Sequence, residues 1–160
     1  MQSLFDCYDV IPCEYGYQFE TNSGARYFIT FVPYPTLSDG ATDCLYMFNI
    51  ERANDKDLQQ GQNDKRERNT IIKLLAEFFK HNEQAMIVVL DVLDGKQEAR
   101  KRLFDQWFNM FNNGVLKRLE APCNIEGEET YAMLYFKVDA SNGVFFEEEF
   151  KVLTSYNFFN

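Results

Sequence analysis

Two hydrophobic periods alternate along the chain, and each predicts its own kind of element. In residues 15–19 and again in residues 27–31, hydrophobic side chains occupy every second position, and an Asn-Ser-Gly stretch separates the two runs. A period of two interrupted by a glycine-containing turn predicts an antiparallel hairpin. The period of two returns over residues 46–50, after a loop rich in proline, glycine and aspartate over residues 33–44, and predicts a third strand.

The period changes to that of a helix after a polar connection over residues 53–63. Asp64 followed by Glu67 is typical of a capped helix start, and hydrophobic residues between Ile71 and Phe79 share one helical face up to an end near His81. A second apolar stripe predicts another helix that ends at residues 112–114. Its members are Ala99, Leu103, Phe104, Trp107, Phe108 and Phe111.

Three further segments complete the predicted fold. The continuous apolar run over residues 85–90 favours a central strand, whereas residues 115–121 and 131–138 predict two more strands, the first near an edge because Pro122 follows it. Residues 144–153 predict a short C-terminal helix with Phe145, Phe146, Phe150 and Leu153 facing inward.

The order of these elements predicts an α+β fold in a single domain over residues 1–160. We expect a mainly antiparallel or mixed sheet of about six strands with two main helices, in the order β-β-β-α-β-α-β-β and then a short helix. Residues 1–13 and 154–160 are expected to be less ordered tails.

Charge excludes some partners and favours others. Sixteen basic residues against twenty-five acidic ones give a net charge of −9, which is the wrong sign for holding duplex nucleic acid. The chain shows neither a basic start followed by a long apolar run nor an apolar window long enough to cross a bilayer. We therefore expect a cytoplasmic protein without membrane contact, and a partner with a basic protein surface if there is one.

Cysteine and histidine usage predicts no metal and no cofactor. Cys7, Cys13, Cys44 and Cys123 form no C-x-x-C pair, and His81 is the only histidine. The cysteines are expected to be reduced thiols, and His81 is expected to favour the carbonyl end of its helix. Nucleophile elbows and glycine-rich phosphate loops are also absent from the sequence.

The joint between the apolar strand and the second helix, Asp91 to Arg100, concentrates polar chemistry. Asp94 followed by Gln97 fits a helix cap, in which the carboxylate accepts from first-turn amides and Gln97 reaches back. On the outer side of the same helix, Glu98 with Arg102 and Lys101 with Asp105 fit i, i+4 ion pairs that need no functional interpretation.

Arg100 and Lys96 fall on the apolar stripe of that helix, so two cations are expected to face the sheet. A buried cation must reach solvent, pair with a carboxylate or receive an anionic ligand. Asp91 is the nearest candidate partner for Arg100, and a structural pair between them is the favoured interpretation. Binding of a small anion by Lys96 and Arg100 is the alternative.

Metal chemistry is a second alternative at the same joint. Asp91, Asp94 and Lys96 form D-x-x-D-x-K, and two carboxylates with a lysine could hold Mg²⁺ and steady a phosphate oxygen. A nuclease would need a further acid from another element and would need both carboxylates to be unoccupied. The cap interpretation already uses Asp94, so these three residues are catalytic candidates only.

Three segments in order resemble a bacterial family of small proteins known only as a domain of unknown function. They are Y-x-F-x-T-x-x-G at residues 17–24, T-I-x-x-x-x-x-x-F-F at residues 70–79, and D-x-x-D-x-K-Q-x-x-R-x-x-x-F-D-x-W-F at residues 91–108. The likeness spans residues 15–111. It implies a bacterial cytoplasmic origin and no particular reaction.

The function that the sequence favours is non-catalytic binding, as an adaptor or an antitoxin-like inhibitor acting through protein–protein contacts. Aromatic residues lie in predicted loops and tails, where tyrosine favours interfaces: Tyr8, Tyr15, Tyr34, Tyr156, Phe158 and Phe159. The alternative is a small-anion-binding protein, or a metal-dependent phosphoryl-transfer or nuclease-like enzyme, that uses Asp91, Asp94, Lys96 and Arg100. The sequence specifies neither a substrate nor an oligomeric state.

Overall fold

The computed structural model describes residues 6–34, 44–53, 65–80, 83–92 and 95–155. These residues form two compact units. Unit 1 comprises the described residues of Met1–Val32 and Met47–Lys80, and unit 2 those of Pro33–Tyr46 and His81–Asn160.

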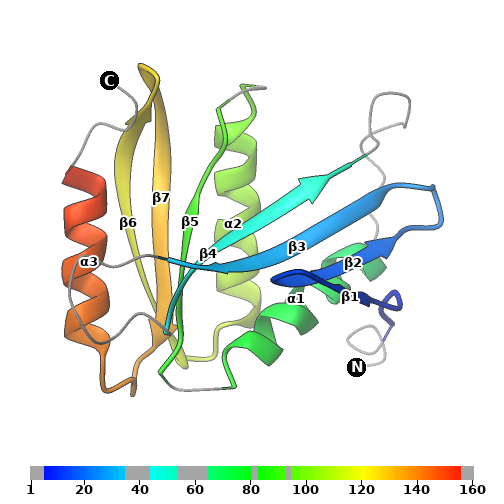
Figure 1. Cartoon of the computed structure of the whole chain (residues 1–160), viewed down its shortest axis with the longest axis horizontal. Helices are drawn as coiled ribbons and strands as arrows, with labels where there is room; N and C mark the ends of the chain where they lie inside the picture. Colours follow the sequence, from blue (N-terminus) through cyan, green and yellow to red (C-terminus); the bar gives the residue numbers. More distant parts are fainter. Residues whose placement is uncertain (1–5, 35–43, 54–64, 81–82, 93–94, 156–160) are drawn as a thin grey trace. The chain divides into compact units, whose positions relative to one another are not determined.

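The described residues form an α+β fold with a mixed sheet of seven strands and three helices (Figure 1). The elements are β1 (Ile11–Cys13), β2 (Gly16–Glu20), β3 (Arg26–Pro33), β4 (Leu45–Arg52), α1 (Lys65–Phe78), β5 (Ala85–Val89), α2 (Gln97–Phe111), β6 (Leu116–Ile125), β7 (Glu128–Lys137) and α3 (Gly143–Ser155). The strand order is β1-β2-β3-β4-β5-β7-β6. The extra strand is β1, which has only three residues and carries no alternating pattern to reveal it.

Unit 1 contains the predicted hairpin, formed by the antiparallel pair β2 and β3. Phe19 and Ile29 are buried on its inner face, as the period of two requires. Gly16 lies against the opposite strand so closely that a Cβ would be 1.9 Å from the carbonyl oxygen of Ile29, so only glycine fits there. Tyr15 was expected in the strand, but it lies in the preceding turn with a φ of 63° and is 54% exposed.

The chain before this hairpin is tied to unit 1 rather than forming a loose tail. Tyr8 is buried, and its backbone N–H donates to Oγ1 of Thr70 at 2.8 Å. Its ring stacks on Phe19 with centroids 5.9 Å apart, and the guanidinium of Arg66 lies 4.1 Å from its centre. Aromatic stacking and a buried hydrogen bond therefore hold Tyr8 in unit 1.

Helix α1 buries Ile71 and Leu74, as the predicted apolar face requires. Thr70, beside Ile71, is also buried, and its hydroxyl donates to the carbonyl oxygen of Arg66 at 2.6 Å. The predicted cap Asp64 and the predicted last residue His81 lie outside the described residues.

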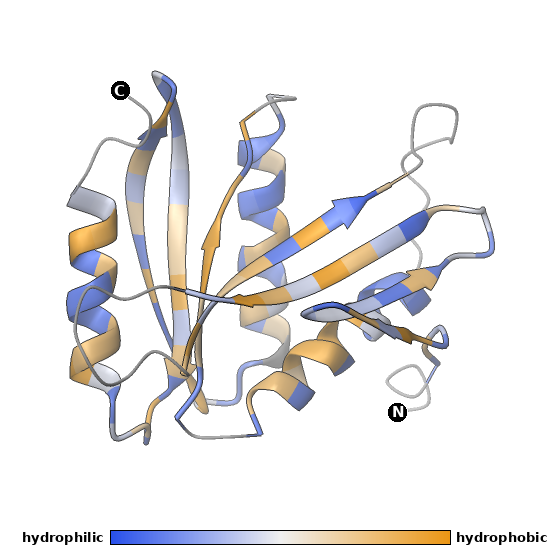
Figure 2. Ribbon diagram, in the orientation of Figure 1, coloured by the Kyte–Doolittle hydropathy of each residue, from blue (hydrophilic) through white to orange (hydrophobic). Residues whose placement is uncertain are grey.

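Unit 2 is built around β5, which is hydrophobic along its whole length (Figure 2). Ala85, Met86, Ile87 and Val88 are all buried, and the strand pairs antiparallel with β7. In the strand order β5 lies between β4 and β7, so the prediction of a central strand is confirmed.

Strands β6 and β7 form a long antiparallel hairpin, and β6 is the last strand in the order. The prediction of an edge strand is confirmed, but the predicted end at residue 121 is wrong, since β6 continues through Pro122 to Ile125. A proline is tolerated there because the N–H that it lacks would point away from the partner strand.

The two faces of this hairpin carry different side chains, because successive residues point to opposite faces. Lys117 pairs with Glu147 of α3, whereas Arg118 pairs with Asp105 of α2. On the α3 face the packing is apolar: Phe136 contacts Phe146, which is completely buried.

Helix α3 confirms the predicted C-terminal helix and runs two residues beyond its predicted end. Phe146, Phe150 and Leu153 are buried as predicted, and Phe145 is half-buried. Residues 154 and 155 therefore belong to the helix rather than to a tail, and residues 156–160 lie outside the described residues.

Candidate functional site

The start of α2 differs from the start that the sequence predicted. The N-cap residue is Lys96, with φ −102° and ψ 18°, and its side chain makes no capping hydrogen bond to the described first turn of the helix. The side-chain nitrogen Nε2 of Gln97 donates to the carbonyl oxygen of Glu129 at 3.1 Å, and its buried Oε1 has no hydrogen-bond partner among the described residues. Lys96 therefore occupies the N-cap position, and Asp94, for which the sequence predicted the capping role, lies outside the described residues.

The other candidate residues of the joint lie near solvent. Asp91 and Lys96 are exposed, and Arg100 is half-buried. Nη1 of Arg100 donates to the backbone carbonyl oxygen of Asp91 at 3.3 Å, on an exposed part of the surface. Trp107 and Phe104 are buried as predicted, but the prediction is wrong for Ala99 and Leu103, which are exposed. The stripe therefore faces the interior only in the later turns of α2.

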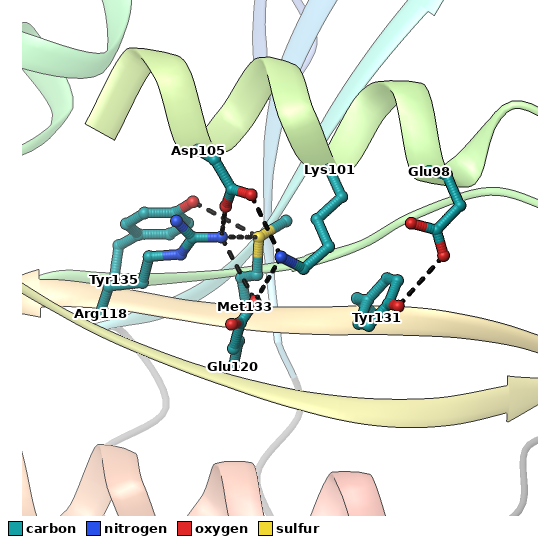
Figure 3. Close-up of polar contacts among 8 residues, drawn as sticks. All are labelled: Glu98, Lys101, Asp105, Arg118, Glu120, Tyr131, Met133 and Tyr135. Atoms are coloured by element: carbon teal, nitrogen blue, oxygen red, sulfur yellow. Dashed lines mark hydrogen bonds and ion pairs between the residues drawn. The ribbon is translucent and has the colours of Figure 1, made fainter. Parts of the chain in front are cut away.

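A different set of charges comes together one turn farther along α2 (Figure 3). Lys101 and Asp105 project from α2, and Arg118 and Glu120 project from β6, so that cations and carboxylates alternate around a closed ring. We call these four residues the charge ring. Nζ of Lys101 lies 3.1 Å from both Oδ2 of Asp105 and Oε2 of Glu120. Arg118 Nη2 contacts Oδ1 of Asp105 and lies 3.5 Å from Oε2 of Glu120.

The charge ring rests on the side chains of β7. Arg118 also donates to the sulfur of Met133 at 3.0 Å, and its guanidinium lies 5.6 Å from the ring centres of both Phe108 and Tyr135. The hydroxyl of Tyr135 donates to the same sulfur at 3.5 Å. Burial in these surroundings raises the pKa of Tyr135, because the phenolate would lose its hydration there.

The pKa values of Asp105 and Lys101 follow from their contacts in the charge ring. Burial pushes the pKa of Asp105 upward, but hydrogen bonds from Arg118 and Lys101 outweigh this effect, so its pKa is lowered overall. The hydrogen bond to Asp105, and after it the one to Glu120, raise the pKa of Lys101. Both directions favour the charged forms of Asp105 and Lys101.

A second link joins α2 to β7 beside the ring. The hydroxyl of Tyr131 donates to Oε1 of Glu98 at 3.0 Å, and Nζ of Lys101 lies 5.1 Å from the centre of the Tyr131 ring. The hydrogen bond to Glu98 is the main reason why the pKa of Tyr131 is raised. The expected pair between Lys101 and Asp105 is confirmed, whereas Glu98 accepts from Tyr131 and forms no ion pair with Arg102.

The arrangement of the ring suits cohesion better than catalysis. Two cations and two carboxylates neutralise one another, so no charge is left over for a substrate or a metal ion. Across the described ranges, no group of three or more His, Cys, Asp or Glu side chains is placed so that it could hold a metal ion. The ring therefore fastens α2 to the β6–β7 hairpin.

Sequence reasoning found half of the ring and missed the other half. The spacing of Lys101 and Asp105 on one helix was visible, but nothing in the spacing of Arg118 and Glu120 pointed to α2. The one available signal was their alternation in β6, which places both on the same face of the strand.

The four cysteines are free thiols, as expected. Cys123 is buried, and this burial raises the pKa of its thiol, so it is not an activated nucleophile. No helix in the described part of the chain is long and apolar enough to span a membrane.

Comparison with known proteins identifies a family but no activity. No curated protein and no solved structure matches the chain. A family model described as "Family of unknown function (DUF6169)" matches residues 63–153. The match covers α1, the joint, the charge ring and α3 as far as Leu153, and so extends beyond residue 111, where the resemblance seen in the sequence ended. The chain therefore belongs to this family of unknown function.

Proposed function

We propose that the chain is a non-catalytic binding protein of the bacterial cytoplasm, and that its partner is a protein with a basic surface. The observation that carries this proposal is the outer face of α3. Val144 is 71% exposed and Val152 is 40% exposed, and Glu148, which is exposed, lies between them. At spacings of four residues the three side chains share one helical face.

Such a face combines the features that a protein partner uses. Two exposed valines offer apolar contact area that water does not favour, and an exposed β-branched residue contributes little to helix stability by itself. Glu148 between them provides a charged contact for a lysine or arginine of the partner. The net charge of −9 would speed the approach of a basic protein and repel an acidic one.

Photo-crosslinking from defined positions tests this proposal. A photoreactive benzoylphenylalanine is placed at position 144 or 152 of the full chain in its native host cell, and at Val115 as the control. Val115 is 49% exposed, so the comparison separates the α3 face from exposed apolar surface in general. We expect an adduct with one basic protein from positions 144 and 152 only.

Glu148→Lys provides an independent arm with the purified adduct partner. The substitution should slow association by about tenfold at low salt and reduce its salt dependence. Glu128→Lys, at another exposed acid, is the matched control and should leave the rate nearly unchanged. The proposal would be contradicted if position 115 gave the same adduct in equal yield. It would also be contradicted if Glu148→Lys associated with the partner as fast as the wild type.

One observation favours a second candidate function, binding of a small anion at the amino end of α2. In the described part of the chain, the side chain of the N-cap residue Lys96 makes no capping hydrogen bond, and Arg100 follows one turn later. Helix amino ends attract anions when their amides are open. In a thermal melt, inorganic phosphate should then raise the melting temperature of the wild type but not that of Lys96→Met. A shift with Mg²⁺ or Mn²⁺ that Asp91→Asn removes would instead support metal-dependent phosphoryl transfer.

A further inference from the structure

Strand β6 presents a backbone edge that no described strand covers. It is the last strand in the order, and its recorded strand partner is β7. In an antiparallel pair, alternate residues direct their N–H and C=O groups to the partner, and the remaining residues direct theirs to the other side. The residues with outward groups can therefore be identified from the register.

The hairpin turn fixes which residues of β6 face outward. Ile125 and Glu128 flank a two-residue turn, Glu126 and Gly127, whose φ values of 52° and 85° are those of a type I′ turn. In such hairpins the flanking residues form a hydrogen-bonded pair. Odd-numbered residues of β6 thus bond to β7, and Arg118 and Glu120 direct their backbone groups to the open edge.

Two neighbouring features support this assignment and limit the length of the open edge. The side chain of Asn112 bonds to both outward groups of Leu116: Oδ1 accepts from the N–H at 2.9 Å, and Nδ2 donates to the carbonyl oxygen at 3.2 Å. Pro122 has no N–H to offer. The open segment is therefore Arg118-Leu119-Glu120, with a blocked position at each end.

This segment is complementary to itself. Antiparallel pairing about a two-fold axis at Leu119 places Arg118 opposite Glu120 of the second copy, and Glu120 opposite Arg118 of the second copy. A shift of the axis by one residue in either direction would place Arg118 opposite Arg118 or Glu120 opposite Glu120. The next pair in the favoured register is Leu116 with Pro122, the two blocked positions, so the ribbon ends where its hydrogen bonds end.

We propose that β6 pairs antiparallel with β6 of a second copy of this chain, centred on Leu119, and joins the two sheets edge to edge. Arg118 and Glu120 keep their contacts in the charge ring, because only their backbone groups are needed for the ladder. Glu120 is 46% exposed in its side chain and remains accessible to the arginine of the second copy. The charged residues and Pro122 protect the edge against unlimited pairing, since they allow a single register.

A disulfide at the axis tests the register. In a non-hydrogen-bonded antiparallel pair the Cα atoms are about 4.5 Å apart, which is within reach of a disulfide. Leu119→Cys should form a covalent dimer under mild oxidation about ten times faster than Ala121→Cys, which would lie opposite Lys117 of the second copy. The wild-type chain, with its four native cysteines, sets the background rate.

Two further measurements keep the proposal falsifiable. Sedimentation equilibrium of the full wild-type chain should give the mass of a dimer at micromolar to submillimolar concentration. If Leu119→Cys does not fold, a mixture of Lys117→Cys and Ala121→Cys should form a mixed disulfide that neither protein forms alone. A monomer throughout the concentration range, or crosslinking no faster than that of Ala121→Cys or the wild type, would overturn the proposal. If the chain is a monomer throughout, the edge of β6 would be open to a strand of another protein.

Discussion

The two faces of the β6–β7 hairpin are held by different forces. On the face toward α3, Phe136 and Phe146 are buried and in contact, and the attraction comes from apolar surface withdrawn from water. On the face toward α2, the charge ring joins α2 to β6 with its side chains between 12% and 46% exposed. The same strands therefore combine one contact whose stabilising effect is independent of pH with another whose stabilising effect depends on pH.

The comparison shows that apolar packing and ion pairing stabilise the hairpin in ways that respond differently to substitution. Apolar packing is non-directional and tolerates changes of shape that conserve volume. The charge ring requires every partner, because removing one member leaves another charge partly buried without compensation. The following four predictions test this difference, beginning with the largest effect.

Phe146→Ala should lower the free energy of unfolding by about 3–5 kcal/mol, because the completely buried ring leaves a cavity in the α3 face. Urea denaturation measures the loss. Val152→Ala, on the exposed side of the same helix, is the matched control and should cost about 0.5 kcal/mol or less. Similar losses in both variants would show that α3 is not anchored through Phe146.

Arg118→Met should cost about 1–3 kcal/mol, less than a fully buried ion pair, because Asp105 is about one-third exposed and keeps Lys101 as a partner. The double variant Asp105→Leu with Arg118→Met should recover much of this loss. Glu77→Gln, which breaks an exposed pair with Lys80, is the control and should cost about 0.5 kcal/mol or less. Strict additivity of the Asp105 and Arg118 effects would contradict the ring as a coupled unit.

The pH dependence of stability should reside on the α2 face. The pKa of Asp105 is lowered in the folded chain, so its contribution is present above the unfolded pKa and is lost as the pH falls through the lowered folded value. The pKa of Lys101 and that of Tyr135 are raised, so their contributions are present below the unfolded values and are lost as the pH rises through the folded values.

Denaturation midpoints measured across the pH range check this assignment. In a plot of stability against pH, Asp105→Asn should reduce the loss of stability at acid pH, and Tyr135→Phe should reduce the loss at alkaline pH. Phe146→Ala should lower the whole curve without changing its slopes, since no titrating group is removed. If Asp105→Asn loses stability at acid pH as steeply as the wild type does, carboxylates other than Asp105 cause the acid loss of stability.

Arg100→Met should have the smallest effect, a change of about 1 kcal/mol or less in the free energy of unfolding. The guanidinium donates to a backbone carbonyl oxygen on an exposed part of the surface, so its removal leaves no carboxylate buried. Urea denaturation again provides the measurement, with Lys96→Met as the control. A loss of about 3 kcal/mol or more would contradict this expectation and support the structural pair with Asp91 that the sequence favoured.

The sequence by itself determined the elements and their order. Alternation in β2 and β3, the apolar run of β5 and the stripe that buries Phe104 and Trp107 all depend on local periodicity, which the chain carries wherever one face is buried. Such signals are absent from β1, whose three residues include Pro12, and they are misleading at Pro122, where a proline suggested an end that an edge strand does not need.

The polar contacts were decided only by the tertiary structure. Lys101 and Asp105 are neighbours on one helix, so their pairing could be read from spacing, but Arg118 reaches Asp105 across thirteen positions of chain. The sequence predicted a buried pair between Asp91 and Arg100, because Arg100 falls on the apolar stripe. In the structure the first turn of α2 lies at the surface, and Asp91 is exposed. Burial decides whether a charge must be paired, and burial depends on how elements pack, a property that no local pattern contains.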